Sequence, residues 1–77
     1  MEIKEIDRTV LADGVVRFHF TMPSSNFYYL GYFLESLEGL CTYTNPPARK
    51  DLMQIDVVPD LIDDFLEVIK AIKNLNF

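Results

Sequence analysis

The stretch that decides the fold is residues 26–40, NFYYLGYFLESLEGL. Its apolar side chains recur at spacings of three and four, which is the pattern of a helix with one buried face. The predicted buried stripe consists of Phe27, Leu30, Leu34 and Leu37, with Phe33 beside it. Because glycine readily adopts the left-handed conformation that ends many helices, we predict that this helix runs to about Leu37 and that Gly39 follows its end.

Three tyrosines and a glycine on this helix are not explained by the buried stripe. Tyr28 and Tyr32 are four residues apart and fall on a different face, with Tyr29 between the two faces. Tyrosine is enriched at protein interfaces, so this face is either an interface or the rim of a core too small to hide it. Gly31 costs a helix about 1 kcal/mol relative to alanine, which indicates close approach of another backbone, either the sheet or a partner helix.

Two strands are predicted before the helix. Asp13 and Gly14 favour a tight hairpin, because glycine accepts a positive φ at no steric cost. Residues 15–21 alternate in polarity, which predicts a strand with one apolar face and one mixed face. The apolar face carries Val16, Phe18 and Phe20. Residues 6–11, on the other side of the turn, are the predicted first strand.

Two more strands and a second helix are predicted after it. Residues 40–44, LCTYT, form a short strand, and a loop with two successive prolines follows. Residues 52–58 alternate again, with Met53, Ile55 and Val57 on one face. Pro59 stands where helices commonly begin, so the second helix runs from there to about Lys73. Its predicted buried stripe consists of Leu61, Phe65, Val68, Ile69 and Ile72.

The predicted order is strand, strand, helix, strand, strand, helix in a single α+β domain, residues 1–77. The βαββα portion matches a ferredoxin-like plait that lacks its last strand, with an antiparallel sheet and both helices on one face. A right-handed crossover places its three strands in the order first, third, second. We predict that the N-terminal strand, residues 6–11, replaces the missing strand beside residues 15–21.

Composition limits the classes of function. A chain of 77 residues buries only about 60% of the surface that its unfolded form exposes, so small domains often gain stability from disulfides, metals or association. One cysteine and one histidine allow neither an internal disulfide nor a zinc site, which leaves association. A net charge of -5 opposes binding to nucleic acid and to anionic membranes. No charged-then-apolar leader opens the sequence, so we expect a cytoplasmic protein.

Few side chains suggest a chemical site. His19 lies on the mixed face of its strand with Arg17, and we expect Cys41 or Tyr43 near them across the sheet. A nucleophilic Cys41–His19 pair would need hydrogen-bond reach, which the spacing does not demonstrate. Four aspartates offer oxygen ligands to a divalent cation, but helix-end electrostatics explain them adequately. These are Asp56, Asp60, Asp63 and Asp64. We therefore predict no bound metal and no cofactor.

Three further features are YFLESLEGL at residues 32–40, Thr42 and Thr44 after it, and VVPD before the last predicted helix. In these features the sequence resembles a small bacterial family known only as domain of unknown function 4911. This resemblance covers about two-thirds of the chain. It implies a compact βαββα domain and carries no assigned activity or site residues. A plait is also similar to the ACT domains, which bind amino acids at paired sheets, but their Pro-Gly turn is replaced here by Pro23-Ser24.

The sequence does not identify the function, but it favours one class of protein. We expect an interaction or regulatory module, not an enzyme, that self-associates as a dimer through the open sheet face or the tyrosine-bearing helix. Two alternatives stay open. One is an ACT-like small-molecule sensor with a pocket between subunits near Arg17, His19 and Tyr43. The other is a minimal enzyme that uses Cys41 and His19.

Overall fold

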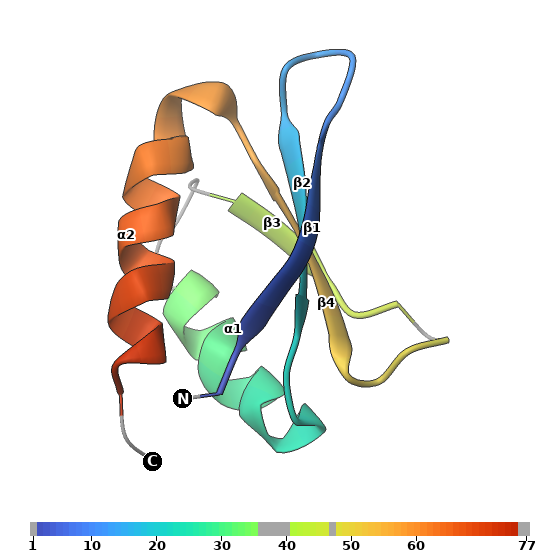
Figure 1. Cartoon of the computed structure of the whole chain (residues 1–77), viewed down its shortest axis with the longest axis vertical. Coiled ribbons are helices and arrows are strands. Elements are labelled where there is room, and N and C mark those ends of the chain that lie inside the picture. The colour runs from blue at the N-terminus through green and yellow to red at the C-terminus, as the bar shows by residue number, and fades with distance from the viewer. Residues whose placement is uncertain (1, 36–40, 47, 76–77) are drawn as a thin grey trace.

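The computed structural model describes residues 2–35, 41–46 and 48–75, without the side chain of Cys41. Two helices and a four-stranded antiparallel sheet form two layers, which confirms the α+β class (Figure 1). The strands are β1 (Lys4–Val10), β2 (Val16–Thr21), β3 (Cys41–Thr44) and β4 (Leu52–Val57). The helices are α1 (Phe27–Glu35) and α2 (Ile62–Lys73), which follow the single 3-10 turns η1 (Ser24–Asn26) and η2 (Pro59–Leu61).

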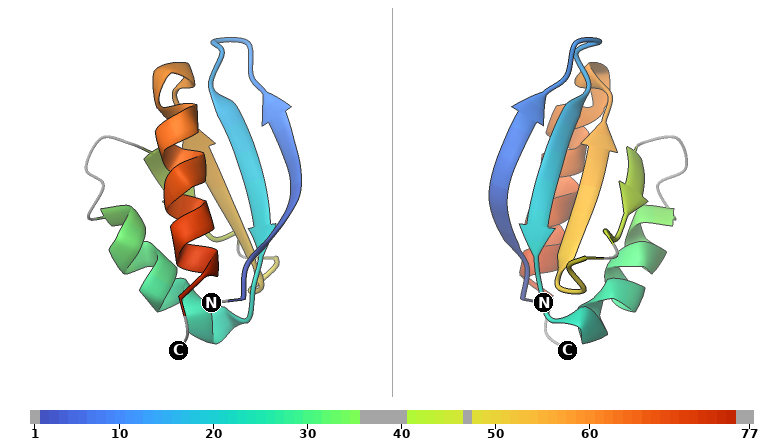
Figure 2. Two further views of the ribbon diagram at one scale, coloured as in Figure 1. Left: turned by 60° about the vertical axis from the view of Figure 1, so that its left-hand side comes forward. Right: turned by 90° about the vertical axis from the view of Figure 1, so that its right-hand side faces the viewer.

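The strand order is β1-β2-β4-β3, and every neighbouring pair is antiparallel. This is the order predicted from the crossover rule, with the N-terminal strand beside β2. Both helices cover the same face of the sheet, and the other face is open (Figure 2). The arrangement is compatible with a ferredoxin-like fold. The predicted end of the first helix and Gly39 lie outside the described residues.

The core lies between the sheet and the helices. The strand positions predicted to face it are buried in both central strands, because alternate residues of a strand point to the same face. Three phenylalanine rings form its centre: Phe65 of α2 lies 5.0 Å from Phe18 and 6.2 Å from Phe20, measured between ring centroids. The buried helix residues are Leu30, Gly31, Leu34, Phe65, Ile69 and Ile72.

The hairpin between β1 and β2 uses the predicted glycine. The N–H of Gly14 donates to the Leu11 carbonyl at 2.9 Å, and the N–H of Leu11 donates to the Val15 carbonyl at 2.8 Å. Gly14 has a φ of 86°, in the left-handed region. The Asp13 carboxylate accepts a hydrogen bond from the N–H of Val15 at 3.1 Å, which supports the turn.

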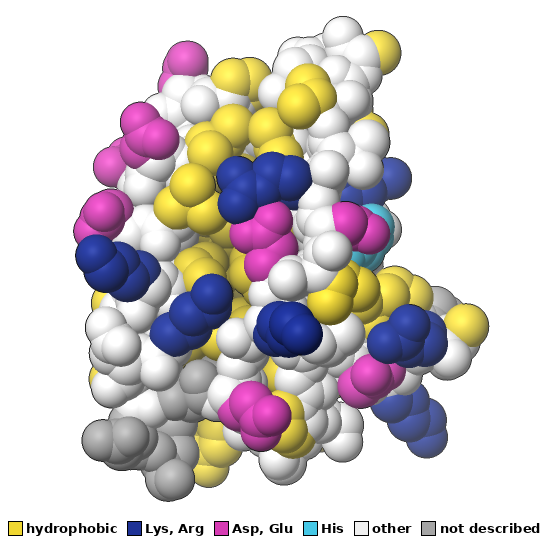
Figure 3. Space-filling model, in the orientation of Figure 1, with side chains coloured by type: hydrophobic (Ala, Val, Ile, Leu, Met, Phe, Trp, Pro, Cys, Tyr) yellow, Lys and Arg dark blue, Asp and Glu magenta, His cyan; other side chains and the backbone are white. Residues whose placement is uncertain are grey.

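A β-bulge in β1 changes which of its side chains face the helices. Glu5 pairs with Phe20 and Asp7 pairs with His19, so the register shifts between them. As a result Glu5 and Arg8 share the helix-covered face, where the two side chains form an ion pair at 2.7 Å. The Arg8 guanidinium carbon lies 4.8 Å from the ring centroid of Phe18. Charged side chains thus lie across the apolar seam between α2 and the hairpin, which Figure 3 shows.

Candidate functional site

The structure separates the predicted site residues into two groups on opposite faces of the sheet. Tyr43 and Phe18 both pair with Ile55, so Tyr43 faces the helices. Arg17 and His19 alternate with Phe18 and therefore lie on the open face. The expectation that Tyr43 lies near Arg17 and His19 across the sheet is therefore wrong, whereas the pocket between subunits stays a prediction. A run as short as four residues leaves the orientation of its side chains weakly specified.

On the open face, Arg17 and His19 each pair with an aspartate. The Arg17 guanidinium donates to both carboxylate oxygens of Asp56 at 3.0 and 3.1 Å, and this hydrogen bonding raises the pKa of Arg17. His19 Nδ1 lies 2.6 Å from Asp7 Oδ1, and Nε2 lies 3.2 Å from Gln54 Oε1. These contacts link β1, β2 and β4 across the face. The face is polar, and Arg17, His19, Asp7 and Asp56 have hydrogen-bond partners inside the chain.

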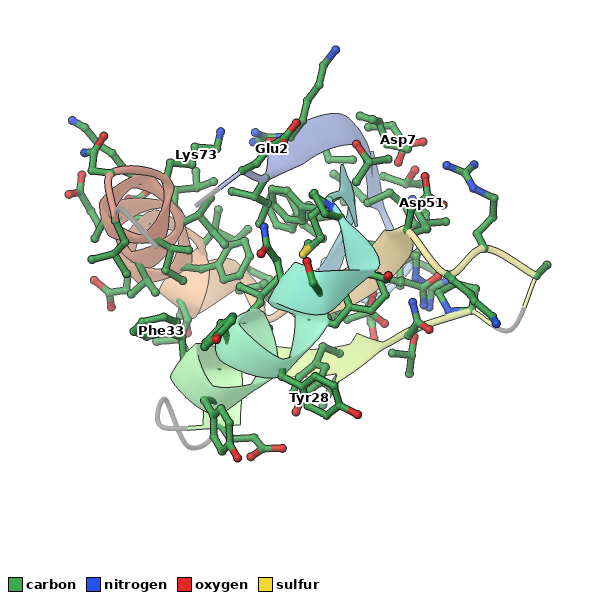
Figure 4. The ribbon with its side chains drawn as sticks, turned by 90° about the horizontal axis from the view of Figure 1, so that it is seen from below. Glu2, Asp7, Tyr28, Phe33, Asp51 and Lys73 are labelled. Atoms are coloured by element: carbon green, nitrogen blue, oxygen red, sulfur yellow. The ribbon has the colours of Figure 1, made fainter. Side chains whose placement is uncertain are left out.

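The second group lines a groove of about 500 Å³ between α1 and β3. Its walls carry four aromatic side chains, and its only charged lining residue among those the structure describes is Glu35. In Figure 4, Tyr28 and Phe33 lie on opposite sides of α1, with Tyr28 over β3 and Phe33 toward α2. The lining residues are Ser24, Phe27, Tyr28, Gly31, Tyr32, Glu35, Tyr43, Thr44, Asn45 and Met53.

Gly31 makes room for one wall of this groove. A Cβ atom at this position would lie 3.3 Å from the hydroxyl oxygen of Tyr43. The predicted close approach at Gly31 therefore exists, but its partner is a side chain rather than a backbone. The Tyr43 hydroxyl donates to Glu35 Oε1 at 2.6 Å, so the same contact holds the carboxylate at the groove.

Tyr28 and Tyr32 are exposed beside the groove. Their exposed fractions are 79% and 71%, whereas Tyr29 is exposed to 47%. Side chains that are so exposed cover little of the core. Their exposure therefore disfavours the interpretation that Tyr28 and Tyr32 form the rim of the core. Their spacing of four residues places both rings along the same side of α1.

We expect Gly31→Ala to stabilise the wild-type protein less than it stabilises a Tyr43→Phe variant. Alanine is favoured over glycine in helices by about 1 kcal/mol, but here the new methyl group must displace the Tyr43 hydroxyl. In the Tyr43→Phe variant the nearest remaining ring atoms lie at 3.8 and 3.9 Å, which is ordinary contact. Urea unfolding of the four proteins should give a coupling free energy of about 1 kcal/mol. Equal effects of Gly31→Ala in both backgrounds would contradict this account.

The alternative chemistry considered from the sequence gains no geometric support. Cys41 pairs with Val57 in the sheet, but its side chain lies outside the described part, so the Cys41–His19 hypothesis stays untested. Asp56 is bound to Arg17. The described residues contain no cluster of three or more histidine, cysteine or acidic side chains that could hold a metal ion.

Comparisons add no relatives: no family model, curated protein or solved structure matches the chain. The resemblance to domain of unknown function 4911 therefore stays a prediction. No helix within the described ranges is long and apolar enough to cross a bilayer.

Sequence reasoning named Tyr28, Tyr32 and Tyr43 as candidate site residues but missed Glu35. The available signal was the position of Glu35 four residues after Gly31, on the same side of the helix.

Proposed function

We propose that this chain is a small cytoplasmic interaction module, built on a ferredoxin-like plait, that forms a homodimer through the exposed tyrosine face of α1. The observation that carries the proposal is the exposure of Tyr28 and Tyr32, at 79% and 71%, on one side of a short helix. Burying two aromatic rings against a second copy would contribute several kcal/mol from apolar area. A domain of this size has a small core and benefits from such burial.

The open sheet face is the weaker choice for the dimer interface. Arg17 and His19 on this face are hydrogen bonded within the chain. A second copy on this face would have to cover those polar groups and would gain little apolar contact in return. Tyr28 and Tyr32 present mainly apolar ring surface, so a second copy would cover fewer charged groups there, which favours the tyrosine face as the interface.

Native mass spectrometry and sedimentation of the wild-type protein test the proposal. We expect a dimer for the wild type and a monomer for the Tyr28→Ala, Tyr32→Ala double variant, because the variant loses the apolar area that drives association. The matched Tyr28→Phe, Tyr32→Phe variant keeps both rings and should remain a dimer. A wild-type mass that stays monomeric at all concentrations would rule out self-association. A dimer that survives the alanine substitutions would move the interface elsewhere.

A second candidate function is a small-molecule sensor. The groove between α1 and β3 favours it, because about 500 Å³ lies within the range of ligand pockets and aromatic walls with a few polar groups are typical of them. This candidate differs from the predicted ACT-like sensor in the location of its pocket. Extra mass retained by the protein in the same native spectra would support it.

A further inference from the structure

The chemistry of the groove between α1 and β3 is selective for charge. Among the lining residues that the structure describes, four are aromatic and Glu35 alone has a formal charge near neutral pH. The face of an aromatic ring carries negative electrostatic potential, so rings and a carboxylate favour the same sign of ligand. The net charge of the whole chain, -5, adds to this preference. An anion would be repelled by all three contributions.

Glu35 has a hydrogen-bond partner within the groove. Its Oε1 accepts the Tyr43 hydroxyl at 2.6 Å, a short hydrogen bond to an ionised acceptor. A carboxylate has about four lone-pair sites, so this contact leaves acceptor capacity for a ligand. The Tyr43 ring is itself positioned against Gly31. The helix, the glycine and the strand together fix where the negative charge lies.

The aromatic walls of the groove can contact the apolar part of a cationic ligand. Tyr28 and Tyr32 belong to the lining and are largely exposed, so in a single copy of the chain their rings are accessible to a ligand. Alkylated ammonium groups bind to such rings because their charge is spread over apolar methyl groups that lose little hydration. Ser24, Thr44 and Asn45 add neutral polar groups to the lining.

We infer that this groove binds a small organic ammonium cation, whose alkylammonium group contacts the rings of Tyr28 and Tyr32 while Glu35 provides the counter-charge. The inference rests on the sensor candidate and gives it a ligand class. It also predicts which residues of the groove select the ligand. The rings hold the alkyl groups, and the carboxylate distinguishes a cation from a neutral molecule of the same shape.

The test uses choline and its neutral isostere 3,3-dimethyl-1-butanol, titrated into the full chain and followed by calorimetry and amide chemical shifts. We expect choline to bind at least about tenfold more tightly than the neutral isostere, with the shift changes centred on α1 and β3. Glu35→Gln should weaken choline binding about tenfold and leave binding of the isostere unchanged. Tyr43→Phe should weaken choline binding less, because it removes only the group that positions the carboxylate.

The outcomes separate this inference from the proposed functions. Equal binding of choline and its isostere, or choline binding that is unaffected by Glu35→Gln, would overturn the cation assignment. If acetate or another anion binds instead, the sensor candidate stands and the ligand class is wrong. If no small molecule binds, both fail. Glu35→Gln keeps both tyrosine rings, so it should not change the dimer measured without ligand. Choline should lower the dimer population of the wild type, because the ligand and a second copy would occupy the same tyrosine rings.

Discussion

Phe65→Ala is expected to leave most of the protein unfolded at room temperature. The Phe65 side chain has no exposed surface, and its ring packs on Phe18 and Phe20 at the centre of the core. Removal of a buried phenylalanine costs about 3–5 kcal/mol, through lost transfer free energy and the cavity left behind. A core in a chain of this size rarely supplies more than about 3–5 kcal/mol in total. The single substitution therefore removes a free energy close to the whole stability.

Circular dichroism and urea unfolding measure this effect. Phe33→Ala is the matched control, because Phe33 is a phenylalanine that is only partly buried at the edge of the same core. It should lower the free energy of unfolding by a smaller amount and leave the protein folded. Phe65→Leu, which keeps most of the volume, should also fold. A folded Phe65→Ala protein with a midpoint near that of the wild type would show that the three-ring centre does not hold the layers together.

Gly14→Val is the substitution with the next largest expected effect, a loss of about 2–3 kcal/mol. Two penalties add. A left-handed φ of 86° is strained for any residue with a Cβ, and most for a β-branched one. In addition, a Cβ at this position would lie 3.2 Å from Cγ of Pro59, at the start of η2. The Pro59 ring or the hairpin turn would have to shift by a few tenths of an ångström to relieve this contact.

The control for this effect is Ala12→Val, which introduces the same side chain in the same turn at an exposed position. Its φ is not positive, so it should change the free energy of unfolding by less than about 0.5 kcal/mol. Gly14→Asn should cost less than Gly14→Val, because asparagine tolerates the left-handed region. Similar losses for Gly14→Val and Ala12→Val would mean that neither the φ nor the proline contact limits this position.

Much of the fold could be predicted because its strongest signals are local. The alternation at Val16, Phe18 and Phe20 identifies a half-buried strand without reference to the rest of the chain. The Asp13-Gly14 pair specifies where the chain reverses. Once these elements are placed, handedness leaves few possible strand orders. The boundaries were less accurate: β1 begins at Lys4, two residues before the predicted start.

The candidate site was harder to predict because it depends on contacts between distant residues. Tyr43 could be assigned to either face, since β3 has only four residues and no clear alternation of polarity. Its true orientation follows from pairing with Ile55 and from the space above Gly31, neither of which the sequence displays. The partners of His19 depend on the bulge in β1, which shifts Asp7 into register. A bulge has no reliable signature in a short mixed strand.

The same bulge has a consequence for how copies of this chain can meet. A sheet with two regular edges can add further strands at both, and such growth leads to fibrils. In this sheet the β1 edge is interrupted between Glu5 and Asp7 and carries several charged residues, both of which discourage strand addition. Only the short β3 edge remains regular over its described residues. Pairing between sheet edges would therefore stop at two copies, which favours a closed assembly over a polymer.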